Sequence, residues 1–246
     1  MSGSGWTAQY YDAVEYYFWG PDKLNAVRRA DAPTTAEAVV GRLKRLEEPL
    51  NHLLTLFFDL VPNSYRRELS ERCAGLDVGN VSAVADRAIP RVFGGLNVAQ
   101  PDVLISGERG LLAVEVKLGS PSDIRQVLKY ALLLSRLSNG RDCGLSYLTQ
   151  RPFERHWRDL ASPDAVREAA LAQLPETERL GQMRLTQDCR DDIERALHGM
   201  RLTSWRFSDL DHLLTDWLER PKDGVGAETL QRLCEGMRDE LRTRGL

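Results

Sequence analysis

Cysteine and histidine are scarce in this chain, with four of each among 246 residues. The cysteines lie far apart, at positions 73, 143, 189 and 234, and no Cys-x-x-Cys pair occurs. A zinc site needs such ligands at close spacing, so we expect reduced, packing thiols and no zinc. The histidines are equally scattered, which favours surface or packing roles.

Long apolar runs are also missing. The longest nearly apolar stretch, Leu50 to Pro62, contains polar residues and is shorter than the roughly 20 residues that span a bilayer. The first residues lack the basic start and apolar stretch of a signal peptide. We therefore expect a cytoplasmic protein without membrane contact. No G-x-x-x-x-G-K-[ST] or G-x-G-x-x-G loop is present, which argues against a nucleotide-driven motor.

The chain carries little net charge, -3 at pH 7, with 42% hydrophobic and 28% charged residues. These values are typical of globular proteins and exclude a disordered or fibrous chain. The mild acidity does not indicate nucleic-acid binding, although a local basic groove can lie on an acidic protein. The length suits one large domain or one core with appendages.

Hydrophobic periodicity predicts a helical segment over 1–46, an α/β core over 47–150 and a helical region over 151–246. In the core, short apolar runs predict strands at 101–106, 111–119 and 144–150, with a weaker strand within 82–93. Residues 107–110 are expected to form a hairpin turn between two of them. Beyond residue 151 we expect helices alone. The predicted helices are 48–60, 65–74, 124–137, 163–173, 188–200, 206–219 and 227–243.

Strand 111–119 carries an acid and a base among small and apolar residues. Alternate side chains of a strand share a face, so Glu115 and Lys117 point away from the core side of Val114 and Val116. An interpretation without any functional role is a cross-strand ion pair on a solvated face. Asp102 begins the preceding strand of the same hairpin, so its carboxylate can converge on Glu115.

The next helix adds two polar residues at matching spacing. Gln126 and Tyr130 are four residues apart and therefore lie on one helix face. A polar edge on an otherwise apolar helix would explain them equally well. Upstream, Glu47 and Glu48 precede Pro49 at the start of the buried helix, where acidic residues also suit the helix dipole.

Taken in order, Pro101-Asp102, then Glu115-Val116-Lys117, then Gln126 and Tyr130 resemble the PD-(D/E)XK nuclease superfamily. The stretch 47–60 resembles the acidic first helix of that family, and the resemblance covers about residues 47–150. It implies a restriction-endonuclease-like αβββαβ core with a mixed sheet, extended by N-terminal helices and a C-terminal helical tail. It also implies metal-dependent hydrolysis of phosphodiester bonds.

The resemblance assigns Asp102, Glu115 and the backbone carbonyl of Val116 to a Mg²⁺ or Mn²⁺ ion, and oxygen ligands suit both ions. Lys117 is expected to orient the attacking water or to stabilise the transition state. A lysine beside two carboxylates should keep its charge, so we favour electrostatic stabilisation. The remaining implied catalytic residues are Gln126, which steadies a water or phosphate, and Glu47, for which the adjacent Glu48 is an alternative.

Basic residues near the predicted site could line a phosphate-binding groove, with a solvated basic face as the alternative. They are Arg125, Lys129 and Arg151, joined by Arg155 and Arg158. The resemblance favours DNA over RNA as substrate, in restriction, defence or repair. The apolar helical stripe of the tail suits packing on the core, a homodimer contact or a partner protein. Its members are Trp205, Leu210, Leu213, Leu214 and Trp217.

Two other classes of function remain open at this point. One is a catalytically silent module that binds nucleic acid or protein on a nuclease-like fold. Loss of Lys117 or Asp102 would have favoured it, and both are present. The other is a structural protein in which Glu115 and Lys117 form only an ion pair, which predicts no metal affinity.

Overall fold

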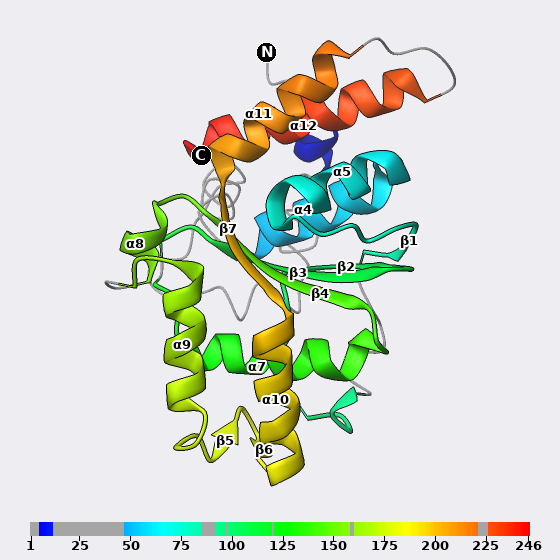
Figure 1. Ribbon diagram of the computed structural model, residues 1–246. Coiled ribbons are helices and arrows are strands. Elements are labelled where there is room, and N and C mark those ends of the chain that lie inside the picture. The colour runs from blue at the N-terminus through cyan, green and yellow to red at the C-terminus, as the bar shows by residue number, and fades with distance from the viewer. Residues whose placement is uncertain are drawn as a thin grey trace, which may run out of the picture. The chain divides into compact units, whose positions relative to one another are not determined.

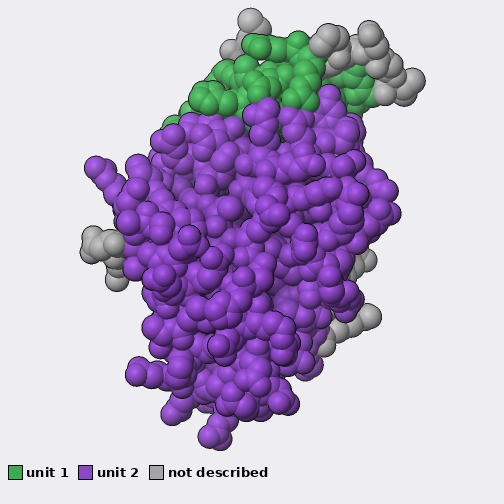
Figure 2. All heavy atoms as spheres, viewed as in Figure 1, with its two compact units in different colours: residues 1–60, 211–246 green, residues 61–210 purple. Residues whose placement is uncertain are grey.

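The computed structural model describes residues 5–11, 47–84, 92–96, 98–119, 121–157, 160–220 and 226–246. The chain forms two compact units, one of residues 1–60 and 211–246 (unit 1) and one of residues 61–210 (unit 2) (Figure 2). Most of the predicted helical segment over 1–46 lies outside the described residues, and so does much of the region 82–93.

Unit 2 is built on a five-stranded mixed sheet with the strand order β1-β2-β3-β4-β7 (Figure 1). The first two pairings are antiparallel and the last two are parallel. The predicted hairpin is confirmed, because β2 and β3 pair directly across the turn at Glu108 and Arg109. The strands are β1 Val81–Ala83, β2 Val103–Gly107, β3 Gly110–Lys117, β4 Asp142–Thr149 and β7 Arg201–Arg206.

The prediction that only helices follow residue 151 is wrong. β7 is the fifth strand of the sheet, and β5 (Arg179–Leu180) pairs with β6 (Met183–Arg184) in a separate small hairpin. β7 ends the sheet's strand order, and Leu202 is its one buried residue. A strand at the end of a sheet does not need a continuous stretch of apolar residues. A prediction that depends on apolar stretches therefore does not find β7. The sheet therefore extends well past residue 150.

Helices cover both faces of this sheet. α5 (Asn63–Ala74) packs on one face, against β4 and β7, while the other face carries three helices (Figure 1). The backbone carbonyl of Cys73 accepts hydrogen bonds from Ser146 and Thr203, at 3.3 and 2.8 Å, which fixes the end of α5 on the sheet. The three helices on the second face are α7 Ile124–Ser138, α9 Pro163–Gln173 and α10 Gln187–Gly199.

The hydrophobic core lies between the sheet and these three helices. Strands covered on both faces are apolar nearly throughout, and residues 111–116 of β3 are all buried. α7 has an apolar face that includes Val127, Leu128 and Ala131. Glu115 is the charged residue among these buried positions of β3, so its burial needs partners that satisfy it.

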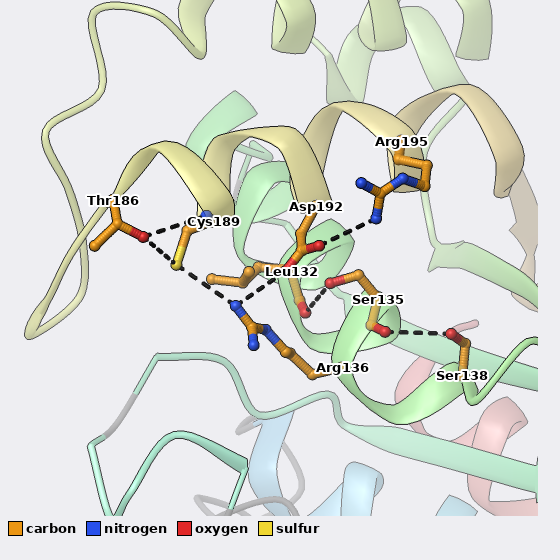
Figure 3. Close-up of polar contacts among 8 residues, drawn as sticks. All are labelled: Leu132, Ser135, Arg136, Ser138, Thr186, Cys189, Asp192 and Arg195. Atoms are coloured by element: carbon orange, nitrogen blue, oxygen red, sulfur yellow. Dashed lines mark hydrogen bonds and ion pairs between the residues drawn. The ribbon is translucent and has the colours of Figure 1, made fainter.

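Polar contacts hold α7 to α10 along one edge of this core (Figure 3). The Arg136 guanidinium lies 2.9 Å from Asp192 Oδ2 and also donates to the sulfur of Cys189. Asp192 in turn pairs with Arg195 at 3.1 Å. Thr186 begins α10 as its N-cap and accepts from the Cys189 amide at 3.3 Å. These contacts fix α7, the helix that carries Gln126 and Tyr130.

Unit 1 is helical in its described part. It contains α4 (Glu47–Leu60), most of α11 (Phe207–Glu219) and α12 (Ala227–Arg244). The ring of Trp217 stacks on that of Phe57, with 6.3 Å between centroids. Trp217 and Leu214 of the predicted stripe are fully buried, so this part of the stripe packs inside unit 1.

Candidate active site and adjoining cleft

The acid and the base of β3 form a buried ion pair. Lys117 Nζ lies 2.7 Å from Glu115 Oε1, and the two side chains are 13% and 5% exposed. The sheet face that carries them is covered by α7, so the pair does not lie on a solvated face. Burying a carboxylate and an ammonium is costly unless further hydrogen bonds satisfy them. The surroundings of Glu115 supply these hydrogen bonds.

Two side chains of α7 donate to the same carboxylate. Gln126 Nε2 donates to Glu115 Oε1, and the Tyr130 hydroxyl donates to Oε2. Burial raises the pKa of Tyr130 well above its usual range, and the charge of Glu115 raises it further, so the phenol remains a proton donor. The structure thus brings the predicted pair Gln126 and Tyr130 directly to Glu115.

Asp102 is tied to the same segment of β3 through the backbone. Its Oδ2 accepts a hydrogen bond of 2.7 Å from the amide of Val116, the residue between Glu115 and Lys117. The antiparallel register makes this contact, because Val103 at the start of β2 pairs with Val114. The hairpin therefore holds a second carboxylate beside the buried ion pair.

These residues fit a hard divalent cation better than zinc. The described residues hold no cluster of three or more His, Cys, Asp or Glu side chains suited to a metal. A carboxylate offers about four lone-pair positions, and three donors occupy three of those of Glu115, which leaves one on Oε2. Mg²⁺ is commonly held by one or two carboxylates with waters. Asp102, Glu115 and the Val116 carbonyl fit that requirement.

Sequence reasoning missed His156 on the short helix α8 (Phe153–His156). His156 is 4% exposed, and its Nε2 shares a 2.5 Å hydrogen bond with the Ser122 hydroxyl. Burial lowers the pKa of His156 to about 4, and the charge of Lys117 contributes, so the imidazole is neutral at pH 7. No motif links residues 117, 122 and 156, so only the fold reveals this cluster.

Tyr147 is a second residue that sequence reasoning missed. It is the partner of Glu115 in the parallel register between β3 and β4, and it is fully buried. Its hydroxyl has no hydrogen-bond partner among the described residues. Burial, followed by the charge of Glu115, raises the pKa of Tyr147 well above its usual range. The strand alternation could have assigned its face but not its neighbour.

A cleft of about 760 Å³ opens next to Gln126 and Tyr130. The predicted basic residues Arg125 and Lys129 both line it, together with Arg179 of the β5–β6 hairpin, which sequence reasoning missed. The predicted Arg151 is exposed after β4 and does not line this cleft. Arg158 lies outside the described residues.

Glu47 begins α4 in unit 1, and its role at the site remains a prediction. The side chain of the alternative acid, Glu48, lies outside the described residues.

Comparison with known proteins gives no match: no family model, curated protein or solved structure is similar to this chain. The resemblance therefore depends on the motif residues alone. Among the described helices, none combines the length and apolar character needed to cross a membrane.

Proposed function

We propose that this chain is a divalent-metal-dependent nuclease of the PD-(D/E)XK type, with a restriction-endonuclease-like core. The hydrogen bond from the Val116 amide to Asp102 carries the proposal, because it fixes a second carboxylate beside the buried pair of Glu115 and Lys117. A structural ion pair would be complete without Asp102. Two carboxylates with one ammonium at a strand end suit the binding of a cation and a phosphate.

Each residue has a distinct role in this proposal. Asp102 and Glu115, with the Val116 carbonyl, hold Mg²⁺ or Mn²⁺. The metal, when bound, lowers the pKa of a coordinated water and offsets negative charge on the phosphate. Lys117 stabilises the anionic transition state through its ammonium group. Gln126 and Tyr130 orient Glu115 by donating to its two oxygens.

A catalytically silent nucleic-acid-binding module is the second candidate. One observation favours it: Lys117 and Gln126 both occupy Glu115 Oε1, so a cation bound at that oxygen must displace one of these donors. Under this alternative the chain would bind nucleic acid without a metal and without cleavage.

Cleavage of supercoiled plasmid and of labelled single strands tests the proposal. The wild type is compared with Lys117→Ala and Asp102→Ala, each with Mg²⁺, Mn²⁺ or EDTA. We expect cutting that requires the metal and that both substitutions abolish. Arg232→Ala is the matched control, because Arg232 is exposed and pairs with exposed Glu228 on α12, and it should cut like the wild type.

Two results would contradict the proposal. Equal cutting by all variants would indicate a contaminant or a different site. No cutting by any form, together with no heat of Mn²⁺ binding in calorimetry, would favour the silent module.

A further inference from the structure

Three cationic side chains surround the cleft beside the candidate active site. Arg125 and Lys129 come from the first turns of α7, and Arg179 comes from β5, at least 50 residues later. None of the three forms an ion pair with a carboxylate in the described part of the chain. Like charges repel unless an anion lies between them, so this arrangement suits an anionic ligand.

The two walls of the cleft are joined and held in place. Arg125 Nη2 donates to the backbone carbonyl of Arg179 at 3.4 Å, which links α7 to the hairpin. The hairpin runs directly into α10, whose N-cap Thr186 and contacts with Arg136 fix it to α7 (Figure 3). The spacing of the cations is therefore set by packed helices.

The one carboxylate among the described lining residues is already engaged with the backbone. Asp123 Oδ1 accepts from the Arg125 amide at 3.0 Å as the N-cap of α7. The apolar part of the lining includes Val98, Ala99 and Leu180. Tyr130 is the aromatic residue in the described lining, and its hydroxyl is committed to Glu115.

We infer that this cleft binds the sugar–phosphate backbone of a nucleic-acid strand next to the bond that is cleaved, with Arg179 as a phosphate-binding residue. This inference deepens the proposed function and rests on it. The cations contact phosphates, which carry no sequence information, so the contact is independent of base sequence. Gln126 and Tyr130 lie between the cleft and Glu115, which joins phosphate binding to the candidate active site.

Anisotropy titrations of the full chain in EDTA test the inference without cleavage. The probes are labelled single strands of thymidine, adenosine and uridine nucleotides and a DNA hairpin. We expect Arg179→Ala and Lys129→Ala each to weaken binding about tenfold, as for loss of one charge-assisted hydrogen bond. Each substitution should also make the dependence of binding on salt shallower, so that the magnitude of the slope of log K against log salt concentration falls by about one.

Arg184→Ala is the matched control. Arg184 is the register partner of Arg179 in the same hairpin, is exposed and does not line the cleft. It should bind within about twofold of the wild type. The thymidine and adenosine strands should bind equally. The uridine strand and the DNA hairpin show whether the cleft prefers DNA or RNA, and single or paired strands. Binding of DNA and of RNA must depend on Arg179 to the same extent.

The inference is overturned if Arg179→Ala and Arg184→Ala weaken binding equally, if neither changes it, or if no probe binds. Its failure is distinguishable from failure of the proposed function. Binding that depends on Arg179, without cleavage in Mn²⁺, would contradict the proposed hydrolysis and support phosphate binding in the cleft. Metal-dependent cleavage, with binding unaffected by Arg179→Ala, would support the hydrolysis and contradict phosphate binding in the cleft.

Discussion

Each unit of this protein contains a buried carboxylate that pairs with a cation and a tyrosine. In unit 1, Arg244 Nε lies 2.6 Å from Glu240 Oε1, and the Tyr11 hydroxyl donates to the same oxygen. In unit 2, Lys117 and Tyr130 meet Glu115. Burial and pairing are nearly the same in both, so neither property identifies an active site.

The two clusters differ in access and in the number of carboxylates that they hold. Arg244 and Glu240 are each 2% exposed and lie four residues apart on one helix, which suits a closed structural contact. Lys117 is partly exposed, Asp102 is held at the same strand, and a cationic cleft adjoins two of the donors. The second carboxylate and the access, more than the burial, support the proposed function for the cluster in unit 2.

Removing the cation of the closed cluster should have the largest effect on folding. Arg244→Met leaves Glu240 buried without its cation, so the free energy of unfolding should fall by about 3–5 kcal/mol. Urea denaturation measures it. Arg232→Met, which breaks an exposed pair on the same helix, should cost less than about 1 kcal/mol. Equal losses would show that the Arg244 pair is not structurally special.

Removing the cation of the open cluster should affect activity most. Lys117→Met should lower kcat by about 10²–10³-fold, equivalent to roughly 3–4 kcal/mol of transition-state stabilisation. Stability should fall less than in Arg244→Met, because Gln126 and Tyr130 still donate to Glu115. Cleavage rates and urea denaturation on the same samples separate the two effects. A loss of stability alone would make both clusters structural.

His156 gives unit 2 a dependence on pH. Its pKa of about 4 in the folded state lies below the value near 6.5 of the unfolded chain. The unfolded state therefore binds the proton more tightly, and stability is lost as pH falls from 6.5 to 4, by up to about 3 kcal/mol. His156→Asn should flatten this part of the pH–stability profile, whereas exposed His198→Asn should not. Unchanged slopes in both would refute the assignment.

The tyrosine hydroxyls provide the smallest test. Tyr130→Phe removes one donor from Glu115 and should cost about 1–2 kcal/mol of stability. It should also lower the cleavage rate, because Glu115 loses its orientation. Tyr11→Phe removes the equivalent donor from Glu240 and should cost a similar amount of stability with cleavage unchanged. Equal cleavage rates in the two variants would contradict a role for Tyr130 in the active site.

Local patterns in the sequence predict much of the candidate site. Strand alternation places Glu115 and Lys117 on one face of β3. Helical spacing places Gln126 and Tyr130 on one face of α7, and in the structure these two faces meet. The β2–β3 hairpin follows from its turn, because its two strands are neighbours in sequence.

Contacts between distant segments escape the same reasoning. Tyr147 lies next to Glu115 because β3 and β4 pair in parallel, with α7 as the connection between them. Periodicity predicts which residues share a face of a strand, but not which strand lies beside it. The β5–β6 hairpin has only two residues in each strand, too few to show alternation, so Arg179 could not be assigned to the cleft. β7 ends the strand order and has one buried residue, so it lacks the apolar run by which a buried strand is recognised.

Binding of Mn²⁺ tests the central claim most directly. Electron paramagnetic resonance follows the loss of the free-ion signal as the wild type, Asp102→Asn and Glu240→Gln are titrated. Asp102 and Glu115 predict one site in the wild type, its loss in Asp102→Asn and its retention in Glu240→Gln. Equal binding by all three proteins, or no binding by the wild type, would contradict a metal site at the end of β3.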